Sequence, residues 1–490
     1  MTAHDEAMTT TQITDLRSAL EFLRSIPGQL ATTDAPVDPY LEIAGIYKRI
    51  GAGTPAMPPT RLGPAMLFTN VKGGGMSVVV GVLASRERTA RLLGSTVERL
   101  PRDLLAALDH PISPAVVPGS RAPCQEVVLR PPLDVQQILP ALTLTELDAG
   151  PYVTLGLVRA EDPETGEADV TIHRLCLQGP DVLSVFFMPG RHIEEFRRKA
   201  EAKGQPLPVS ISIGLDPAVY VAACFEPPTT PLGLDELTVA GGLRGRPVEV
   251  VECVSVAAKA LAQAEIVIEG EIPPLERIRE DTQSGTGYAM PEFPGYMGTA
   301  QPSLPIVRVT AVTHRRDPIF QALVNPGEEH ANLAGIPTEA SIMRLVERGM
   351  PKRLQGVYCH PAGGGKYVAI LSFRKLSADD EGLPRQAALA AFAAFGELKH
   401  VILVDDDVDI FNTDDVLWAM TTRYQGDVST MLLPGVRCHS LDPTQSPDFN
   451  PLLPAPGTSC KTVFDCTVPT RMRDRFRRAE FRQVDLPECY

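Results

Sequence analysis

The apolar residues of this chain change their spacing twice along its length, and that change constrains the fold more than any other feature. From about Val127 to Phe320 they form short runs typical of strands, separated by turns such as residues 162–166. After Asn325, strand-like and helical runs alternate, which is typical of a small α/β unit. One ordinary core does not accommodate 490 residues, so we expect an α+β protein of two or three domains.

Proline marks the boundaries between these regions. Residues 111–132 are rich in proline, and residues 325–327 read Asn-Pro-Gly, which favours a turn. We therefore expect an N-terminal α/β region over 1–125, a central and mostly β domain over 126–320, and a C-terminal α/β domain over 321–490.

Several segments have apolar residues at helical spacing. Helices are expected at residues 14–26, 86–93, 192–203 and 385–398. Thr338 is expected to cap a further helix, which carries Ile342, Leu345 and Val346 on one face. The basic run 471–478 is interpreted as a solvated helix face.

Charge and cysteine content exclude several classes of function. The formal net charge is -14 and the sequence pI is about 5.2, so we expect no general surface for nucleic acids or anionic membranes. No apolar run approaches the roughly 20 residues of a membrane helix, and the first residues lack the basic start and apolar core of a secretory signal. The nine cysteines contain no CxxC pair. Reduced thiols and a cytoplasmic location are therefore expected.

Three charged residues lie in segments that a purely structural role explains poorly. Arg174 ends the strand-like run 169–174, and Glu280 and Glu292 bracket a loop. An arginine beside two carboxylates can hold a carboxylate substrate, keep one glutamate ionised and leave the other able to carry a proton. A reaction that removes CO2 from, or adds it to, a carbon acid requires a group that holds the carboxylate and a group that carries the proton.

Glu292 is the better candidate for the proton carrier. Its neighbours include Met290, Phe293 and two prolines, and an apolar environment raises the pKa of a carboxyl group. Glu280 stands in a run of charged residues. It is either the ion-pair partner of Arg174 or one more charge of that run.

The segments around these residues resemble the UbiD family of reversible decarboxylases, which use prenylated FMN. The order and spacing of the similar segments carry the resemblance, which covers most of the chain. They are residues 68–73, 236–245, 264–270, 330–340, 404–411 and 434–437. The resemblance implies that the central region is a split β-barrel that holds the flavin and is related to FMN reductases. It also implies a long helix leading to the C-terminal domain, which packs over the active site and takes part in assembly of a homodimer or homohexamer.

The resemblance also implies a metal site beside the flavin, which a flavin prenyltransferase would supply in its prenylated form. In the family a divalent ion, usually Mn²⁺, bridges the flavin phosphate to an asparagine, a histidine and a glutamate, and K⁺ lies nearby. Asp169, His192 and Glu236 stand at these positions. Aspartate keeps an oxygen ligand and adds a negative charge, which a hard divalent cation tolerates. The alternatives stay open that Asp169 ends a turn, that His192 begins a helix, and that Asp235 competes with Glu236.

One strand is expected to run along the flavin. By the resemblance, the backbone of Val170, Thr171, Ile172, His173 and Arg174 would line it, together with Arg191 and His192. Arg191 lies either near the phosphate or the substrate, or exposed on a helix.

One feature departs from the family pattern. The two glutamates are usually five residues apart, whereas Glu280 and Glu292 are twelve apart. The insertion from Thr282 to Tyr288 is expected to face the substrate or a partner. By the resemblance, Arg174 pairs with Glu280 and stabilises the substrate carboxylate, and Glu292 carries the proton.

We therefore predict reversible, non-oxidative decarboxylation of an aromatic or heteroaromatic acid of the pyrrole, furan, indole or phenazine type. The ring would lie in a slot walled by Ile172, Met290 and Phe293, and CO2 would be released. The alternatives are an FMN-binding oxidoreductase on a related barrel and a non-catalytic flavin-binding accessory subunit. Residues 405–407 are not expected to converge on a metal, because side chains alternate sides along a strand. The absence of a GxSxG motif argues against a serine hydrolase.

Overall fold

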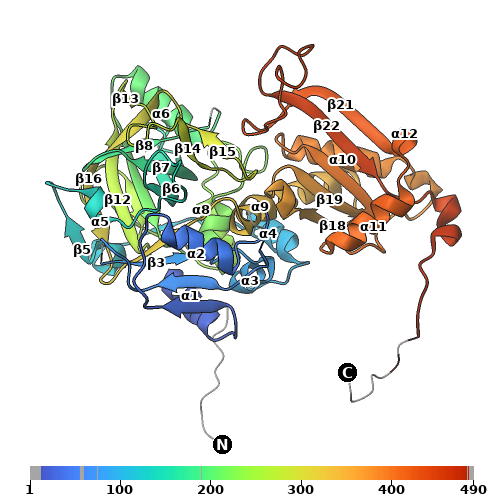
Figure 1. The fold of residues 1–490 in the computed structure, drawn as a ribbon, viewed down its shortest axis with the longest axis horizontal. Coiled ribbons are helices and arrows are strands. Elements are labelled where there is room, and N and C mark those ends of the chain that lie inside the picture. Colours follow the sequence, from blue (N-terminus) through green and yellow to red (C-terminus); the bar gives the residue numbers. More distant parts are fainter. Residues whose placement is uncertain (1–12, 56–59, 74, 189, 483, 485–490) are drawn as a thin grey trace, which may run out of the picture.

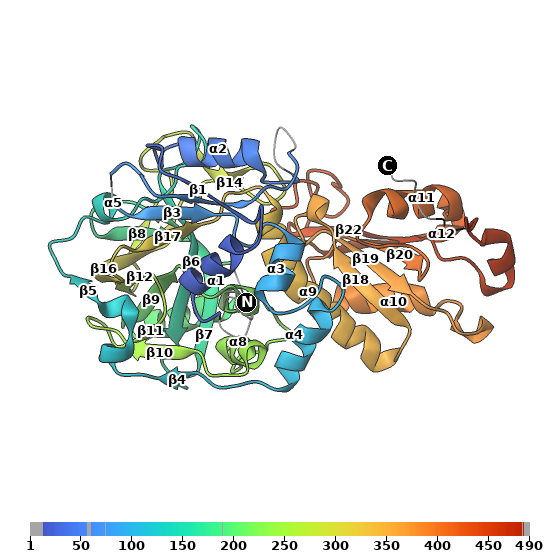
Figure 2. The ribbon, with the colours of Figure 1, turned by 90° about the horizontal axis from the view of Figure 1, so that it is seen from below.

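The computed structural model describes residues 13–55, 60–73, 75–188, 190–482 and 484. Figures 1 and 2 show two lobes, one formed by the N-terminal and central regions and the other by the C-terminal region. Helix α9 (Glu328–Gly349) lies between the lobes. Residues 1–12, on which the expectation about a secretory signal rests, lie outside the described part.

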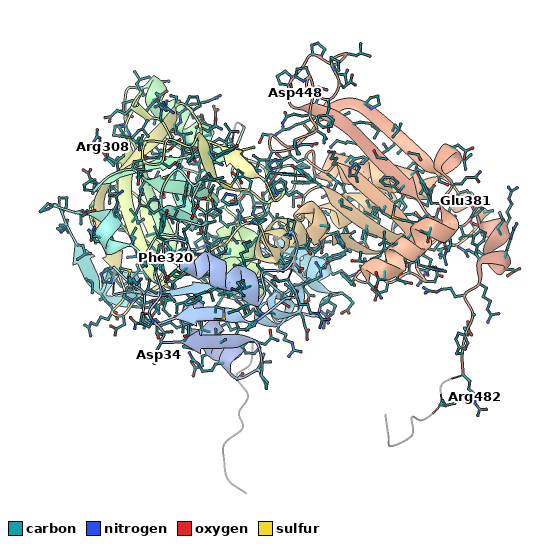
Figure 3. The ribbon with its side chains drawn as sticks, in the orientation of Figure 1. Asp34, Arg308, Phe320, Glu381, Asp448 and Arg482 are labelled. Atoms are coloured by element: carbon teal, nitrogen blue, oxygen red, sulfur yellow. The ribbon has the colours of Figure 1, made fainter. Side chains whose placement is uncertain are left out.

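A four-stranded sheet of order β1-β2-β3-β17 forms the N-terminal layer. Its strands are β1 (Leu30–Thr33), β2 (Ala65–Phe68), β3 (Ser77–Val80) and β17 (Ile319–Ala322). The accompanying helices are α1 (Leu16–Arg24), α2 (Glu42–Ile50), α3 (Arg86–Leu92) and α4 (Leu100–Asp109). Phe320 on β17 is fully buried in an apolar cluster that this sheet shares with the central region (Figure 3). The sheet therefore depends on a strand that follows the central region in the chain.

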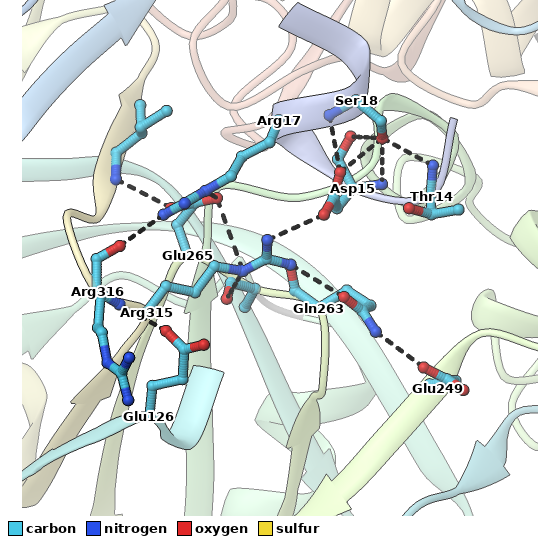
Figure 4. A network of polar contacts seen from close by, with 12 residues as sticks. Thr14, Asp15, Arg17, Ser18, Glu126, Glu249, Gln263, Glu265, Arg315 and Arg316 are labelled. Atoms are coloured by element: carbon cyan, nitrogen blue, oxygen red, sulfur yellow. Dashed lines mark hydrogen bonds and ion pairs between the residues drawn. The ribbon is translucent and has the colours of Figure 1, made fainter. Parts of the chain in front are cut away.

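Helix α1 forms where local sequence predicts it. Asp15 accepts a hydrogen bond from the backbone N–H of Ser18 and so caps the helix. Its buried residues are Leu16, Ala19, Leu20 and Leu23. Arg17 donates two hydrogen bonds to the buried carboxylate of Glu265, and Arg315 pairs with Asp15 (Figure 4). Charge pairs as well as apolar packing therefore attach this helix to the central region.

Six antiparallel strands of the central region close into a β-barrel. Their order is β12-β9-β6-β7-β8-β16, and pairing of β16 with β12 completes the ring. The strands are β6 (Tyr152–Glu161), β7 (Ala168–Leu177), β8 (Val182–Val185), β9 (Leu207–Ile213), β12 (Ile266–Ile272) and β16 (Leu304–His314). Strand β6 bulges before Gly156, where a Cβ would lie 2.8 Å from Ile211 and 2.9 Å from Leu175.

Shorter elements surround the barrel. The strands are β4 (Ala115–Val116), β5 (Val127–Leu129), β10 (Glu249–Glu252), β11 (Lys259–Leu261), β13 (Arg277–Ile278), β14 (Tyr288–Pro291) and β15 (Met297–Thr299). The helices are α5 (Val135–Ile138), α6 (His192–Ala202), α7 (Pro217–Ala222) and α8 (Leu237–Arg244). Strands β14 and β15 form a hairpin with Glu292 in its turn.

The C-terminal lobe is a five-stranded sheet of order β18-β19-β20-β22-β21 with helices packed against it. Its strands are β18 (Leu354–Cys359), β19 (Val368–Phe373), β20 (His400–Asp405), β21 (Thr430–Arg437) and β22 (Thr458–Asp465). Its helices are α10 (Leu383–Ala394), α11 (Thr413–Arg423) and α12 (Gly426–Ser429). The described residues also form short 3₁₀ helices at Gly119–Arg121, Pro123–Gln125, Pro361–Gly363, Ala378–Asp380 and Thr470–Phe476.

The expectation that Thr338 caps a helix is wrong. Helix α9 begins at Glu328, and the Thr338 hydroxyl donates a 2.8 Å hydrogen bond to the carbonyl of Ala334 inside it. Pro337 also lies inside the helix, where proline is normally unfavourable. Every residue from 331 to 343 is buried, so tertiary packing outweighs the local signals.

The predicted fold class is confirmed: an α+β protein with a closed barrel between an N-terminal region and a C-terminal α/β domain. Each of the four segments expected to be helical contains a helix. The segment Thr470–Phe476 is a 3₁₀ helix without buried residues, in agreement with a solvated basic run. Within the described ranges, no helix is long and apolar enough to cross a membrane.

Candidate active site

A cavity of about 230 Å³ lies where the barrel, helix α9 and the C-terminal lobe meet. Its apolar walls include Leu155, Ile172, Phe186, Met290, Phe293, Leu323, Leu333 and Leu441. The three residues expected to wall a slot are therefore part of one cavity. Arg174, Glu292, Lys366 and His439 are among its polar residues.

Arg174 on strand β7 joins the two glutamates that the sequence singles out. Its Nε and Nη2 donate to Glu280 Oε1 and Oε2 at 2.8 and 2.9 Å, and its Nη1 donates to Glu292 Oε1. The guanidinium lies 4.3 Å from the ring centroid of Phe186. The insertion therefore leaves the three charged groups together.

The insertion itself does not reach the cavity. None of the residues 281–288, all of which the structure describes, lines it. Of the two expectations for the insertion, the one that it faces the substrate is therefore wrong for this cavity, and the one that it faces a partner stays a prediction. The insertion lies between the short strands β13 and β14.

Glu280 is surrounded by hydrogen-bond donors. In addition to Arg174, Oε1 accepts from the Tyr152 hydroxyl at 3.1 Å and Oε2 accepts from the Gln301 backbone N–H at 3.0 Å. Its side chain is 1% exposed. A carboxylate has about four acceptor positions, and all four are used by protein donors. Glu280 is therefore placed to hold Arg174 and not to exchange a proton with a ligand.

Glu292 has a different environment, although it contacts the same arginine. Its side chain is 13% exposed and lies against the cavity. Burial raises the pKa of Glu292, and the charge of Arg174 opposes this increase. Among the described residues Arg174 is its hydrogen-bond donor, so a carboxylate oxygen stays available to take up or release a proton.

A second charged group lines the same cavity. Glu226 accepts a 2.6 Å hydrogen bond from Arg191, and Lys366 Nζ lies 3.4 Å from the same carboxylate oxygen. Burial alone would raise the pKa of Glu226, but Lys366 and Arg191 lower it to about 2. The Arg191 side chain is 21% exposed, so the alternative of an exposed helix arginine is wrong.

Two neutral imidazoles accompany this group. His330 stacks on Phe293 with ring centroids 5.2 Å apart, and His439 meets the same ring edge-on at 4.9 Å. Burial lowers the pKa of His330 to about 3 and that of His439 to about 2. His330 Nε2 is buried without a hydrogen-bond partner among the described residues. A neutral imidazole there can donate to or accept from a polar group of a ligand.

Asp169, His192 and Glu236 form a cluster of three potential metal ligands. One ligand atom from each lies within 4.8 Å of the others, and His192 Nδ1 lies 2.9 Å from Asp169 Oδ1. Glu236 Oε2 is buried without a partner among the described residues. Burial, followed by the charge of Asp169, raises the pKa of Glu236 well above its ordinary value. A divalent cation would give Glu236 Oε2 a partner and would favour the ionised form of this carboxyl group. The three residues therefore fit a divalent cation.

The cluster resolves the competition between Asp235 and Glu236. Asp235 accepts a hydrogen bond from the Leu237 N–H at 2.8 Å and acts as a helix cap, whereas Glu236 points to Asp169 and His192. His192 begins helix α6 and also belongs to the cluster. The structural and the metal-binding interpretations of this histidine are therefore compatible.

The residues of strand β7 that were expected along the flavin do not all line the cavity. Thr171, Ile172, His173 and Arg174 line the cavity. The side chain of Val170 is instead buried in an apolar cluster, so it does not reach the cavity. Burial lowers the pKa of His173 to about 4, which keeps this imidazole neutral.

Sequence analysis did not single out several polar residues of the site. They are Tyr152, Glu226, Gln301, Lys366 and His439. Lys366 alone follows a usable signal, the run Gly363–Gly365. A Cβ on Gly364 would overlap the ring of Phe293, which shows that the glycine permits a close contact at the cavity.

Family models match nearly the whole chain. Models described as the N-terminal, Rift-related and C-terminal domains of 3-octaprenyl-4-hydroxybenzoate carboxy-lyase match residues 22–108, 115–328 and 331–466. A gallate decarboxylase of Lactiplantibacillus plantarum is 47% identical over 482 residues, which cover 97% of this chain and 98% of the relative.

Solved structures agree with these matches. A 3,4-dihydroxybenzoic acid decarboxylase of Klebsiella pneumoniae is 55% identical with a TM-score of 0.93, and the match covers 96% of this chain and 98% of that one. The UbiD-class enzyme HmfF from Pelotomaculum thermopropionicum, solved in complex with FMN, is 35% identical with a TM-score of 0.85. That match covers 95% of this chain and 97% of the HmfF chain.

Proposed function

Because the chain belongs to the UbiD family of carboxy-lyases, we propose that it catalyses reversible, non-oxidative decarboxylation of a hydroxylated aromatic acid with prenylated FMN. One observation carries the proposal: a single arginine contacts two glutamates, and only the glutamate that borders the cavity, Glu292, keeps an oxygen for proton exchange. The arrangement matches the demands of a reaction that replaces a carboxylate by a proton.

Arg174, Glu280 and Glu292 each have a separate role in this reaction. Arg174 stabilises the substrate carboxylate by charge-assisted hydrogen bonds, and Glu280 holds Arg174 in position. When the bond to the carboxylate breaks and CO2 leaves, protonated Glu292 gives its proton to the ring carbon. In the carboxylation direction, the Glu292 carboxylate removes that proton. Bound prenylated FMN supplies the acceptor for the electron pair released at this bond.

The proposed cofactor site uses the cluster of Asp169, His192 and Glu236. These residues would hold a divalent cation, Mn²⁺ in this proposal, that binds the flavin phosphate, with K⁺ nearby. The buried and unpartnered Glu236 Oε2 supports a cation there. We further propose that a flavin prenyltransferase supplies the cofactor and that the chain assembles as a homodimer or homohexamer.

A benzoate with adjacent hydroxyl groups is the proposed substrate class. The names of the gallate and 3,4-dihydroxybenzoate decarboxylases favour it over the pyrrole, furan, indole and phenazine acids. The cavity supports it, because apolar walls suit a ring, and His330, Lys366 and His439 offer polar atoms for hydroxyl groups. An FMN oxidoreductase would not need an arginine between two glutamates.

Turnover of matched acids tests the proposal. After co-expression with a flavin prenyltransferase, CO2 release is measured for 3,4-dihydroxybenzoate, gallate, 4-hydroxybenzoate, benzoate and pyrrole-2-carboxylate. We expect acids with adjacent hydroxyls to react at least about 100-fold faster than benzoate, because unpaired polar groups in the cavity disfavour the unsubstituted ring. Enzyme expressed without the prenyltransferase is the control and should be inactive.

Other results of this assay would each contradict one part of the proposal. Faster turnover of pyrrole-2-carboxylate contradicts the substrate class. Flavin binding without release of CO2 from any acid supports the accessory subunit, and reduction of the flavin by a nicotinamide without CO2 release supports the oxidoreductase.

A further inference from the structure

The loop of residues 281–288, which contains the insertion Thr282–Tyr288, folds back on itself. The Asp281 carboxylate accepts hydrogen bonds from the backbone N–H groups of Gly285 at 2.8 Å and Gly287 at 2.6 Å. Both glycines have positive φ angles, 70° and 78°, which suit glycine and allow this tight path. The insertion is therefore an ordered loop with internal hydrogen bonds.

Side-chain hydrogen bonds connect this loop to the end of strand β7. Thr282 Oγ1 donates to Gln178 Oε1, and Gln283 Nε2 donates to the Leu177 carbonyl at 2.5 Å. Gln178 Nε2 in turn donates to the backbone carbonyl of Glu280 at 2.7 Å. The loop, the end of β7 and the backbone of Glu280 are therefore one connected unit.

A longer segment between the glutamates needs such connections. Each added residue increases the number of conformations open to the segment, and this freedom opposes a fixed position of Glu280. The hydrogen bonds to Gln178 and Leu177 remove that freedom beside the residue that holds Arg174. The loop does not line the cavity, so any influence on the reaction is indirect, and its hydrogen bonds through Gln178 lead to Glu280.

We propose that Gln178 and Thr282 are positioning residues: they fix the backbone of Glu280 so that its carboxylate keeps Arg174 directed at the reacting carboxylate. This inference rests on the proposed function. Neither residue contacts the cavity, and both act through Glu280. Displacement of a substrate-holding group by about 1 Å lowers a rate by about 100-fold, so the connection has a measurable consequence.

Two substitutions test the connection in protein purified without flavin. Backbone hydrogen exchange of residues 281–288 is expected to accelerate at least about tenfold in Gln178→Ala and in Thr282→Val, because both lose the hydrogen bond between Thr282 and Gln178. Thr282→Ser keeps the hydroxyl and should restore slow exchange. Gln136→Ala is the matched control, because Gln136 also donates to the Leu177 carbonyl but contacts neither the loop nor Glu280.

The same variants are then assayed in the flavin-loaded enzyme. For Gln178→Ala and Thr282→Val we expect kcat to fall about tenfold to 100-fold with KM changed less than about threefold, and Thr282→Ser to restore kcat. Wild-type kcat in both variants overturns the inference, whether or not exchange accelerates. Thr282 is exposed, so Thr282→Val tests the inference even if Gln178→Ala does not fold.

The design separates this inference from the proposed function. If the wild-type enzyme releases no CO2 from any acid, the proposed function fails, while unchanged hydrogen exchange in the variants overturns the connection independently. If the wild type turns over and the variants match it in rate, the positioning role fails and the proposed function stands.

Discussion

Two buried arginine–glutamate pairs in this molecule have the same chemistry and different surroundings. Arg174 and Glu280 pair at the cavity at 2.8 and 2.9 Å, and Arg86 and Glu339 pair between helices α3 and α9 at 2.8 and 2.6 Å. The glutamate side chains are 1% and 0% exposed. Burial and two-point geometry therefore do not by themselves distinguish a catalytic pair from a structural one.

The structural pair is packed against aromatic rings. The Arg86 guanidinium lies 5.2 and 4.9 Å from the ring centroids of Tyr358 and Phe411, and Glu339 also accepts from the Cys359 N–H at 2.9 Å. Neither Arg86 nor Glu339 lines the cavity. This pair joins the N-terminal region, helix α9 and the C-terminal lobe.

The pair at the cavity differs by one additional carboxylate. Arg174 also contacts Glu292, which borders the cavity and has a raised pKa because of burial. The comparison suggests that proton exchange, and not the ion pair, marks the reactive site. Four experiments test this difference between the two sites.

The largest expected effect is the loss of activity in Glu292→Gln. The amide keeps the size of the side chain but cannot carry the proton, so kcat for CO2 release should fall about 10³-fold. The melting temperature should change by less than about 4 °C, because Arg174 keeps its ion pair with Glu280. Residual activity within tenfold of wild type would exclude Glu292 as the proton carrier.

The second expected effect is a loss of stability in Glu339→Ala. Arg86 then remains as a buried charge without a partner, which lowers the free energy of unfolding by about 3–5 kcal/mol in urea denaturation. Glu347→Ala is the matched control on the same helix. It removes an ion pair with the half-exposed Arg102 and should cost less than about 1 kcal/mol. Equal losses in the two variants would contradict the structural role of Glu339.

The third expected effect is a pH dependence of kcat, which comes from Glu292 beside the Arg174–Glu280 pair. Under the proposed function protonated Glu292 is the proton donor, so kcat should fall about tenfold for each pH unit above the raised pKa of this residue. Because the folded pKa exceeds the unfolded one, the corresponding stability is complete below the ordinary carboxyl pKa and is lost as pH rises through the folded value. A pH profile of kcat that is flat or rises over this range would contradict the assignment.

The smallest expected effect comes from Tyr152→Phe. Glu280 loses one of its four donors, and kcat should fall about tenfold with little change in KM. Tyr220→Phe is the control, because Tyr220 is also fully buried but donates to the Leu155 carbonyl and not to Glu280. Both variants should lose some stability. A similar loss of kcat in both would show that the hydroxyl of Tyr152 has no specific role.

Local patterns in the sequence predicted the elements where one physical signal dominates. Helix α1 has a capping aspartate and an apolar stripe, and both act within a few residues of the chain. Helix α9 shows the limit of such signals, because it runs through Pro337 and past Thr338 where local rules predict a boundary. Its burial against several elements supplies a larger free energy than capping or proline does.

The sequence also determined which charged residues needed an explanation. Arg174 and Glu292 stand in partly apolar segments, and a charge in such a segment is costly unless it has a partner. That argument does not find Tyr152, Glu226 or Lys366, whose contacts at the site come from distant parts of the chain.

Tertiary structure alone decided which groups meet. Closure of the barrel and the return of the C-terminal lobe bring Arg174, Glu226 and Lys366 to one cavity, although they are far apart in sequence. The free energy of a buried charge depends on the groups within a few ångströms of it, and the fold, not the neighbouring residues in the chain, supplies those groups.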